Sequence, residues 1–303
     1  MEWCLKILGS SSALPTDTRM LSSQLLTTHS HHFLFDCGEG TQFQLRRFGA
    51  SIFKIDTIFI SHLHGDHLFG LFGLLSSLHM YNRIKPLRIF GQKGIQAVVD
   101  MVLQTTNTKL DFSVEIIELQ PSEFDVVFED EELKVYTVPL RHSVVSSGFY
   151  VVQKPGKRNI RKEFVESHHI DFSWFPRIQN GEDYLNEEGQ LFKNKDITKP
   201  PANPKTYAYI SDTAYLPEIA KYLKGVDLLY HEATFAEEHQ ADARAKLHST
   251  AKEAARIALS AQAKKLLIGH FSTRYSQVDK LVQEAKDIFQ NTEAVFDGMD
   301  IKF

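Results

Sequence analysis

The sequence predicts a protein of the α+β class, a single domain over residues 1–303 with one inserted segment, and three observations support this prediction. Short apolar runs of strand-like composition recur along the chain and repeatedly end in polar residues. Helical segments with amphipathic spacing are fewer and easier to delimit. One long stretch, residues 153–205, departs from both patterns and is rich in proline, glycine and charge.

The composition is that of an ordinary soluble globular protein. Of the 303 residues, 43% are hydrophobic and 24% are charged, and a chain of this length fits one large domain or two closely packed halves. The N-terminus has no signal-peptide pattern, and no run approaches the roughly 18 apolar residues that span a bilayer. Because two cysteines, Cys4 and Cys37, cannot form a disulfide framework, we expect a reduced, cytoplasmic protein without membrane contact.

Polar side chains follow the ends of five apolar runs, and histidine dominates among them. The chain has 14 histidines, and imidazole is the commonest metal ligand in proteins. Because strands hold side chains more rigidly than loops do, the pattern predicts a site along one edge of a sheet. The runs and the residues that follow them are 57–60 with His62, 133–138 with His142, 207–210 with Asp212, 228–230 with His231, and 266–268 with His270.

Three segments predict helices. Thr250 and Glu253 have the spacing of a capping box, and apolar residues follow at helical intervals as far as Ala261. The segments 278–289 and 95–103 are amphipathic in the same way. The capped segment is the best defined of the three, because its start signal and its periodicity agree.

The stretch 153–205 predicts an inserted arm, the alternative being a long surface loop. Loops of this length inside compact domains are uncommon unless they are functional or disordered. Its start carries Lys157, Arg158 and Arg161, which form either a solvated face or a patch for a phosphate backbone. Trp174 either stacks on RNA bases or packs the arm itself. The net charge of −4 argues only weakly against such a partner, because binding follows local patches.

The segment from His62 to His67 carries three imidazoles and one carboxylate within six positions, directly after a strand-like run. Side chains alternate along extended backbone, so His62 and His64 are expected to face one metal ion. Asp66 and His67 follow the turn at Gly65 and are available for a second ion. Polar side chains packed this densely are costly to desolvate without a metal, which makes a solvated histidine-rich turn the weaker interpretation.

A two-ion site needs more ligands than this segment offers, and residues at other strand ends supply them. The absence of cysteine from the set favours a hydrolytic zinc site over a structural one. A bridged pair of ions about 3.5–4 Å apart suits in-line displacement at phosphorus. The expected grouping is His62, His64 and His142 for one zinc ion, Asp66, His67 and His270 for the second, and Asp212 as the bridge.

The segment from His62 to His67 resembles the signature of the metallo-β-lactamase superfamily, whose members carry out many chemistries. Other segments narrow the resemblance to the ribonuclease Z family, and the similarity runs from Ile7 almost to the C-terminus. The segments similar to that family are Leu8–Thr16 followed by Arg19, Phe35–Gln42, His231–Thr234, His248–Thr250 and Gly269–Tyr275.

This resemblance implies a four-layer αββα metallo-β-lactamase sandwich with an inserted protruding arm, two zinc ions per subunit, and a homodimer. It implies removal of the 3′ trailer from precursor tRNA, with a 3′-hydroxyl left on the tRNA and a 5′-phosphate on the trailer. It places the metal ligands on the same seven residues and assigns Asp66 as proton acceptor. In many bacterial relatives the tip of the arm is rich in glycine and proline, whereas this chain has Ser173–Arg177 there. The RNA contacts of the arm therefore do not follow from the resemblance.

A proton donor for the leaving oxygen is also expected. His248 is our candidate, oriented by Glu232, since a carboxylate commonly fixes a catalytic imidazole. We expect the amides of the helix that starts at Thr250 to favour a phosphate beside His248. A helix-flanking surface histidine is the alternative for His248. His231 has a core or supporting role as readily as a catalytic one, and Arg274 is either a phosphate contact or a structural arginine.

Two other functions fit parts of the sequence. One is a hydrolase of the same superfamily that acts on a small phosphodiester or thioester and has no use for a basic arm. The other is a non-catalytic RNA-binding module with structural zinc, which the thiolate-free ligand set and Asp66 disfavour. Cleavage of a tRNA precursor separates the predicted nuclease from both.

Overall fold

The structure, a computed structural model, describes residues 2–120 and 123–303 and divides the chain into two compact units. The larger one, here called the body, comprises residues 1–129, 135–151 and 206–303. The smaller one, here called the arm, comprises residues 130–134 and 152–205, and the predicted insertion 153–205 lies within it. Among the described residues, no helix has the length and apolar character needed to cross a membrane.

The first sheet of the body has seven strands, and its central strands run parallel. Strands β3 to β6 are parallel neighbours, whereas β18, β1, β2 and β3 pair in antiparallel fashion. In spatial order the strands are β18 (Asp300–Lys302), β1 (Cys4–Gly9), β2 (Ser23–Thr27), β3 (His32–Phe35), β4 (Thr57–Phe59), β5 (Leu87–Gln92) and β6 (Val114–Leu119). The helices associated with this half are α1 (Thr41–Arg47), η1 (Ile52–Lys54), α2 (Gly65–Leu68), α3 (Gly70–Met80) and α4 (Ile95–Thr105).

The second sheet also has seven strands, of which β14 to β17 are parallel neighbours. In spatial order the strands are β17 (Thr292–Ala294), β16 (Lys265–Gly269), β15 (Leu228–Glu232), β14 (Thr206–Ile210), β9 (Ser147–Gln153), β8 (Leu133–Pro139) and β7 (Val126–Glu129). The helices of this half are η3 (Pro217–Lys221), η4 (Glu237–His239), α8 (Gln240–Lys246), α9 (Ala251–Ala261) and α10 (Asp279–Lys286).

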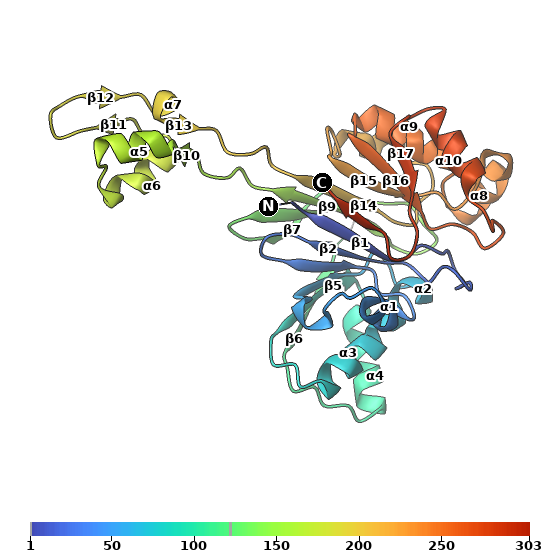
Figure 1. Cartoon of the computed structure of the whole chain (residues 1–303). Helices are drawn as coiled ribbons and strands as arrows, with labels where there is room; N and C mark the ends of the chain where they lie inside the picture. Colours follow the sequence, from blue (N-terminus) through green and yellow to red (C-terminus); the bar gives the residue numbers. More distant parts are fainter. Residues whose placement is uncertain (1, 121–122) are drawn as a thin grey trace. The chain divides into compact units, whose positions relative to one another are not determined.

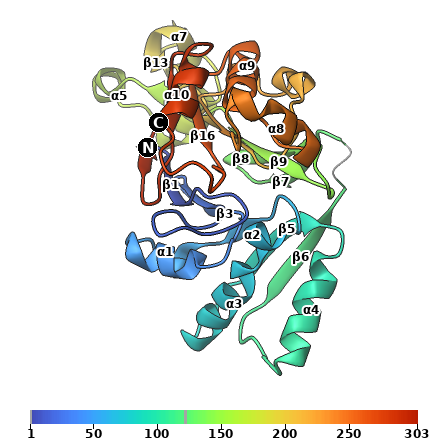
Figure 2. The same ribbon diagram turned by 90° about the vertical axis from the view of Figure 1, so that its right-hand side faces the viewer.

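The two sheets of the body pack face to face between outer helices, which gives the expected four-layer αββα sandwich (Figures 1 and 2). Aromatic side chains fill the space between the sheets: Phe35 of β3 lies 5.6 Å from Tyr209 of β14 between ring centroids, and Phe59 of β4 lies 5.1 Å from Phe149 of β9. Leucine and isoleucine side chains of α3 and α4 form a second core against the outer face of the first sheet.

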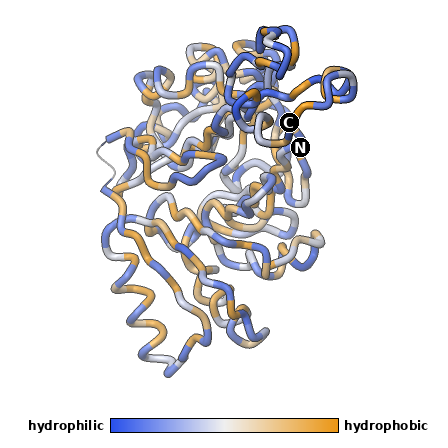
Figure 3. Tube along the Cα trace, turned by 90° about the vertical axis from the view of Figure 1, so that its left-hand side faces the viewer, coloured by the Kyte–Doolittle hydropathy of each residue, from blue (hydrophilic) through white to orange (hydrophobic). Residues whose placement is uncertain are grey.

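The three helices predicted from the sequence are present. Thr250 caps α9, with its side chain accepting from the Glu253 amide while the Glu253 carboxylate accepts from the Thr250 amide. The segment 95–103 forms most of α4, along which hydrophobic and hydrophilic residues alternate (Figure 3). The segment 278–289 contains α10, although only Asp279–Lys286 is helical.

The arm has regular structure and a small core of its own. The buried side chains of Ile170, Ile178, Tyr184 and Ile197 form that core. Trp174 packs against it, with its ring edge-on to Tyr184 at 5.2 Å, so this indole has a packing role. The elements of the arm are β10 (Asn159–Ile160), α5 (Lys162–His168), η2 (Phe172–Trp174), α6 (Phe175–Gln179), β11 (Tyr184–Leu185), β12 (Leu191–Phe192), α7 (Asn194–Ile197) and β13 (Thr198–Lys199).

Candidate metal centre

The seven predicted ligands come together where parallel strands end. His62 follows β4 after two residues, Asp212 follows β14 after one residue, and His270 directly follows the last residue of β16. Because β4 belongs to the first sheet and β14 and β16 belong to the second, the site lies where the carboxyl ends of parallel strands of both sheets meet, and not along the edge of one sheet as predicted. The remaining ligands, His64, Asp66, His67 and His142, lie in loops or the short helix α2 beside this edge.

The side chains form two clusters that match the expected grouping. One consists of His62, His64 and His142, and the ligand atoms of this group lie within 4.8 Å of one another. The His64 Nδ1 atom is 3.1 Å from the His62 Nε2 atom and 3.3 Å from the His142 Nε2 atom. The second cluster consists of Asp66, His67 and His270, within the same limit.

Asp212 lies between the two clusters, with one carboxylate oxygen towards each. Its Oδ1 atom is 3.5 Å from His67 Nε2 and 3.2 Å from His270 Nε2. Its Oδ2 atom is 3.8 Å from the Nε2 atoms of both His62 and His142. A carboxylate in this arrangement has the geometry to bridge two cations.

The buried imidazole nitrogens of the centre fit metal coordination. The Nε2 atoms of His67 and His270 are buried and have no hydrogen-bond partner within the described parts of the chain. Unpaired polar atoms of this kind are costly unless a cation binds them. Burial lowers the pKa of His62 and of His64, which favours neutral imidazole, the form that coordinates a metal.

Asp36 orients the His67 ring through the nitrogen that faces away from the cluster. The His67 Nδ1 atom lies 2.6 Å from Asp36 Oδ2, so that Nε2 is left for a metal. The same carboxylate accepts from the Tyr209 hydroxyl at 2.6 Å and from the Ser61 amide at 2.7 Å, which ties both sheets to one ligand. Glu39, the other carboxylate of the segment Phe35–Gln42, is exposed, and the described residues provide it with no hydrogen bond.

Unusual backbone conformations occur at three positions of the centre. Ala13, Asp36 and His270 have positive φ values of 59°, 56° and 57° without being glycine. The Ala13 amide donates to Asp66 Oδ2 at 2.9 Å, which fixes that carboxylate from the outer side. Left-handed backbone at non-glycine residues is costly and persists where the surroundings impose it, commonly at functional sites.

His248 and Glu232 form an ion pair beside the clusters. The His248 Nδ1 atom lies 2.8 Å from Glu232 Oε1. Burial alone would lower the pKa of His248, but the Glu232 carboxylate outweighs this effect and raises the pKa to about 9. Glu232 is fully buried and accepts from the Thr213 amide at 3.0 Å and from the Thr234 hydroxyl at 2.7 Å.

Thr234 connects this pair to His270, a candidate metal ligand, and the sequence does not indicate this contact. Its hydroxyl donates to Glu232 Oε2 and lies 2.9 Å from the Nδ1 atom of His270. Because the hydroxyl hydrogen is used on Glu232, the His270 Nδ1–H donates to the Thr234 oxygen and Nε2 is left for a metal. Threonine in the segment His231–Thr234 carried no chemical signal of this role in the sequence.

The structure contradicts the expectation that the amides at the start of α9 favour a phosphate. The Thr250 and Glu253 amides are taken by the capping box, and the Ala251 amide donates to the Phe235 carbonyl. The buried Glu253 carboxylate also occupies the positive end of the helix dipole. Positive charge for a phosphate near His248 must therefore come from other residues.

Other sequence candidates have simpler surroundings. His231 lies within β15, paired in register with Ile210 and Ile268, and is buried outside the metal clusters. Arg274 donates to Asp242 at 3.0 Å and stacks over Phe235. Of the two roles considered for Arg274, phosphate contact and structural arginine, these contacts fit the structural one.

The basic residues of the arm differ in whether their side chains are bound to other residues of the chain. Arg158 donates to the Thr198 hydroxyl at 2.7 Å, which holds part of its guanidinium. Lys157 and Arg161 are exposed, and neither side chain has a hydrogen bond or ion pair among the described residues. These two charges are available to an outside partner.

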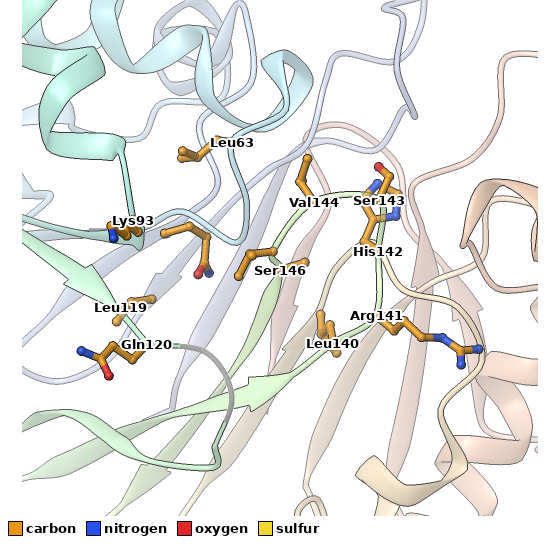
Figure 4. A pocket seen from close by; sticks show the side chains of 12 residues that line it. Leu63, Lys93, Leu119, Gln120, Leu140, Arg141, His142, Ser143, Val144 and Ser146 are labelled. Atoms are coloured by element: carbon orange, nitrogen blue, oxygen red, sulfur yellow. The ribbon is translucent and has the colours of Figure 1, made fainter.

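A pocket of about 1010 Å³ opens beside His142 (Figure 4). Its lining is largely apolar, with Leu63, Leu140 and Val144 around it and Arg141 at one end. The volume is at the upper end of ordinary ligand pockets, about 300–1,000 Å³. The metal centre thus borders a space large enough for a substantial substrate.

A two-sheet αββα sandwich with a histidine–aspartate cluster at its strand ends defines a protein of the metallo-β-lactamase fold. The fold matches the metallo-β-lactamase fold protein YhfI from Bacillus subtilis, with a TM-score of 0.70 over 100% of this chain and 99% of that one at 18% identity. The chain belongs to the ribonuclease Z family. It is 42% identical to Ribonuclease Z from Porphyromonas gingivalis over 295 residues, 97% of each chain.

One further structure resembles the chain along its whole length, and one family model matches its first half. The human tRNase Z, short form, has a TM-score of 0.73 and 27% identity, covering 98% of each chain. A family model described as anti-Pycsar protein Apyc1 matches residues 3–157. This range contains the segment from His62 to His67 and His142, whereas Asp212 and His270 lie beyond it.

Proposed function

We propose that this protein is a metal-dependent endoribonuclease that removes the 3′ trailer from precursor tRNA. The products are a 3′-hydroxyl on the tRNA and a 5′-phosphate on the trailer. The ribonuclease Z relatives support the substrate. The observation that carries the chemistry is the position of Asp212, whose two oxygens face two separate clusters of ligands.

Two zinc ions per subunit fit the donor set, which consists of nitrogen and carboxylate oxygen without thiolate. When bound, such a pair supplies an activated water and neutralises charge on the scissile phosphate. The residues that would hold the ions are His62, His64 and His142 for one, Asp66, His67 and His270 for the other, and Asp212 for both.

The protein residues then handle the protons. Asp66 accepts the proton of the attacking water; nearby imidazoles hold its pKa below the usual range despite burial, so it is a carboxylate at neutral pH. His248 donates a proton to the leaving 3′-oxygen of the tRNA, and Glu232 holds its ring in position. His248 Nδ1 lies 4.0 Å from Asp212 Oδ2, and His270 Nε2 lies 3.2 Å from Asp212 and 3.8 Å from Asp66. These distances support the action of Asp66 and His248 on one phosphate.

The arm supplies affinity for the tRNA in this proposal. Lys157, Arg158 and Arg161 contact backbone phosphates, which gives affinity that depends on salt and carries no sequence information. The exposure of Lys157 and Arg161 supports this role. Arg274 is a weaker candidate for phosphate contact, because Asp242 already pairs with it.

A homodimer is part of the proposal, and an apolar face of the body supports it. Phe43, Phe53 and Tyr81 are 69%, 48% and 57% exposed and line a pocket of about 610 Å³ near α1. Exposed aromatic groups of this kind mark association surfaces. We place the protein in the cytoplasm, in keeping with free thiols at Cys4 and Cys37.

The test is incubation of the zinc-loaded protein with a trailer-bearing tRNA precursor, followed by mapping of both product ends. We expect one cut at the trailer junction, with the end groups given above. The Asp66→Ala variant should bind the precursor and leave it uncut, because affinity comes from phosphate contacts elsewhere. Hydrolysis of a small phosphodiester or thioester without precursor cleavage would instead support the alternative hydrolase of the same fold.

A further inference from the structure

A second, smaller pocket borders His248. Its volume is about 210 Å³, and its lining consists of Arg141, Ala214, Tyr215, Arg244, His248 and Glu253. It is smaller than the roughly 300–1,000 Å³ typical of pockets for whole small molecules. A group of the size of a phosphate, with part of its sugar, fits such a space.

Two arginine side chains in the lining of this pocket carry positive charge that no carboxylate of the described residues pairs with. Arg141 and Arg244 are exposed, and neither guanidinium has a hydrogen bond or ion pair among residues 2–120 and 123–303. This sets them apart from Arg274, which Asp242 neutralises. The Glu253 carboxylate, whose oxygens accept from the Thr250 amide and the Gln240 side chain, makes no ion pair with either guanidinium, and the two arginines outnumber this one carboxylate in the lining.

The backbone of Arg141 is fixed to the metal centre. Its carbonyl accepts from the Ala214 amide at 2.8 Å, and its amide donates to the Thr213 hydroxyl at 3.2 Å. It directly precedes the ligand His142 and borders both the small pocket and the larger one. Arg244 lies on α8. The residue before Arg244 is Ala243, and its carbonyl accepts from the His248 amide at 2.8 Å.

We propose that Arg141 and Arg244 bind the phosphate one nucleotide upstream of the scissile bond, on the tRNA side. This inference rests on the proposed function, in which His248 protonates the leaving 3′-oxygen of the last tRNA nucleotide. A pocket that borders His248 then receives that nucleotide, whose own 5′-phosphate is the nearest further anion. Guanidinium groups bind phosphate oxygens through paired N–H donors, and the amides of α9 are not free to do so.

The test combines protein variants with one chemical change in the substrate. Arg141→Ala and Arg244→Ala should each raise the KM for precursor tRNA about 10-fold or more, the effect of one charge-assisted hydrogen bond. Zinc content should not change. Lys224→Ala removes an exposed charge elsewhere in the body and should leave the KM unchanged. Arg244→Lys should raise the KM less than Arg244→Ala does, because lysine keeps the positive charge but lacks the paired N–H donors of the planar guanidinium.

The substrate change is a neutral methylphosphonate linkage in place of the upstream phosphate. With the unaltered protein it should raise the KM about as much as the arginine variants do. With the double variant Arg141→Ala/Arg244→Ala it should have little further effect, because both contacts are already absent. Additive effects of the two changes, or a loss that follows a methylphosphonate placed on the trailer side, would overturn the proposal. If the unaltered protein cleaves no precursor, the proposed function itself is overturned. This outcome differs from the ones above, which require a protein that cleaves precursor.

Discussion

His248 is the residue whose role is easiest to separate from metal binding. Its Nδ1 atom is bound to Glu232, so its other ring nitrogen is free to act on the substrate. We expect His248→Ala to lower kcat for precursor cleavage by about 10²- to 10⁴-fold, the usual contribution of general acid–base catalysis. Zinc content measured on the same sample should be unchanged. Loss of zinc would mean that His248 is a ligand.

Thr234 should behave differently, because its hydroxyl serves both His270 and Glu232. Thr234→Val leaves the His270 Nδ1–H without a partner in a buried place, and should lower both zinc affinity and kcat by about 10- to 100-fold. Thr234→Ser keeps the hydroxyl and should restore most of both. Thr292→Val, at a buried threonine of β17 outside the metal clusters, is the control. A serine variant as poor as the valine one would reduce Thr234 to a packing residue.

At the residue scale, the sequence indicates the candidate ligands, which the structure brings together, more readily than the residues that support them. His62, His64 and His67 are recognisable because several ligands share one short segment. Asp212 becomes recognisable because it follows a strand-like run. Thr234 could not be found in this way, since hydroxyl groups are common and its partners are distant in sequence. The free guanidinium of Arg244 is likewise visible only once its neighbours are known.

At the scale of elements, the contact between α3 and the loop after β3 positions the second cluster. A Cβ added at Gly70 would lie 2.0 Å from the Gly38 carbonyl oxygen, so only glycine fits there. The Gly70 amide donates to the Cys37 carbonyl at 2.9 Å, and the Cys37 amide donates to the His67 carbonyl at 2.8 Å. The helix, the loop and a ligand are therefore one rigid assembly.

Gly70→Ala should consequently lower the free energy of unfolding by about 1–3 kcal/mol, the usual cost of overpacking, and weaken zinc binding with it. Gly73→Ala, on the same helix, is the control: there the added carbon meets the side chain of Gln42, which can move. Urea unfolding and a zinc titration of both variants give the comparison. Equal behaviour of the two would show that the close approach of α3 is unimportant.

Elements with a strong local signal were predictable, and those determined by packing were not. The capping box of α9 appears in the sequence because its two partners are three residues apart. By contrast, α3 has the composition Gly-Leu-Phe-Gly-Leu-Leu, which has no clear polar face, and its identity depends on the sheet beneath it. The short strands of the arm, such as β10 and β13, pair across about forty residues and leave no local pattern.

For the whole molecule, the division into body and arm predicts separable tasks. Replacing residues Pro155 to Pro204 by a short linker should leave zinc content and small-phosphodiester hydrolysis intact, because no proposed ligand lies in that segment. Cleavage of precursor tRNA should collapse, mainly through weaker binding. The combined substitution of Lys157, Arg158 and Arg161 by Ala should reduce affinity and flatten its salt dependence, by about one unit or less of logarithmic slope per contact. An armless protein that processes precursor normally would leave the arm without a role in tRNA binding.

In the proposed function, precursor tRNA is cut at a bridged pair of metal ions in the body. The most direct test removes metal with a chelator, adds zinc in steps, and measures bound zinc and precursor cleavage on each sample. We predict no cleavage by the metal-free protein, and full cleavage at the trailer junction only when both clusters on either side of Asp212 are filled, at two ions per chain. Full cleavage without metal, or with one ion per chain, would contradict the account.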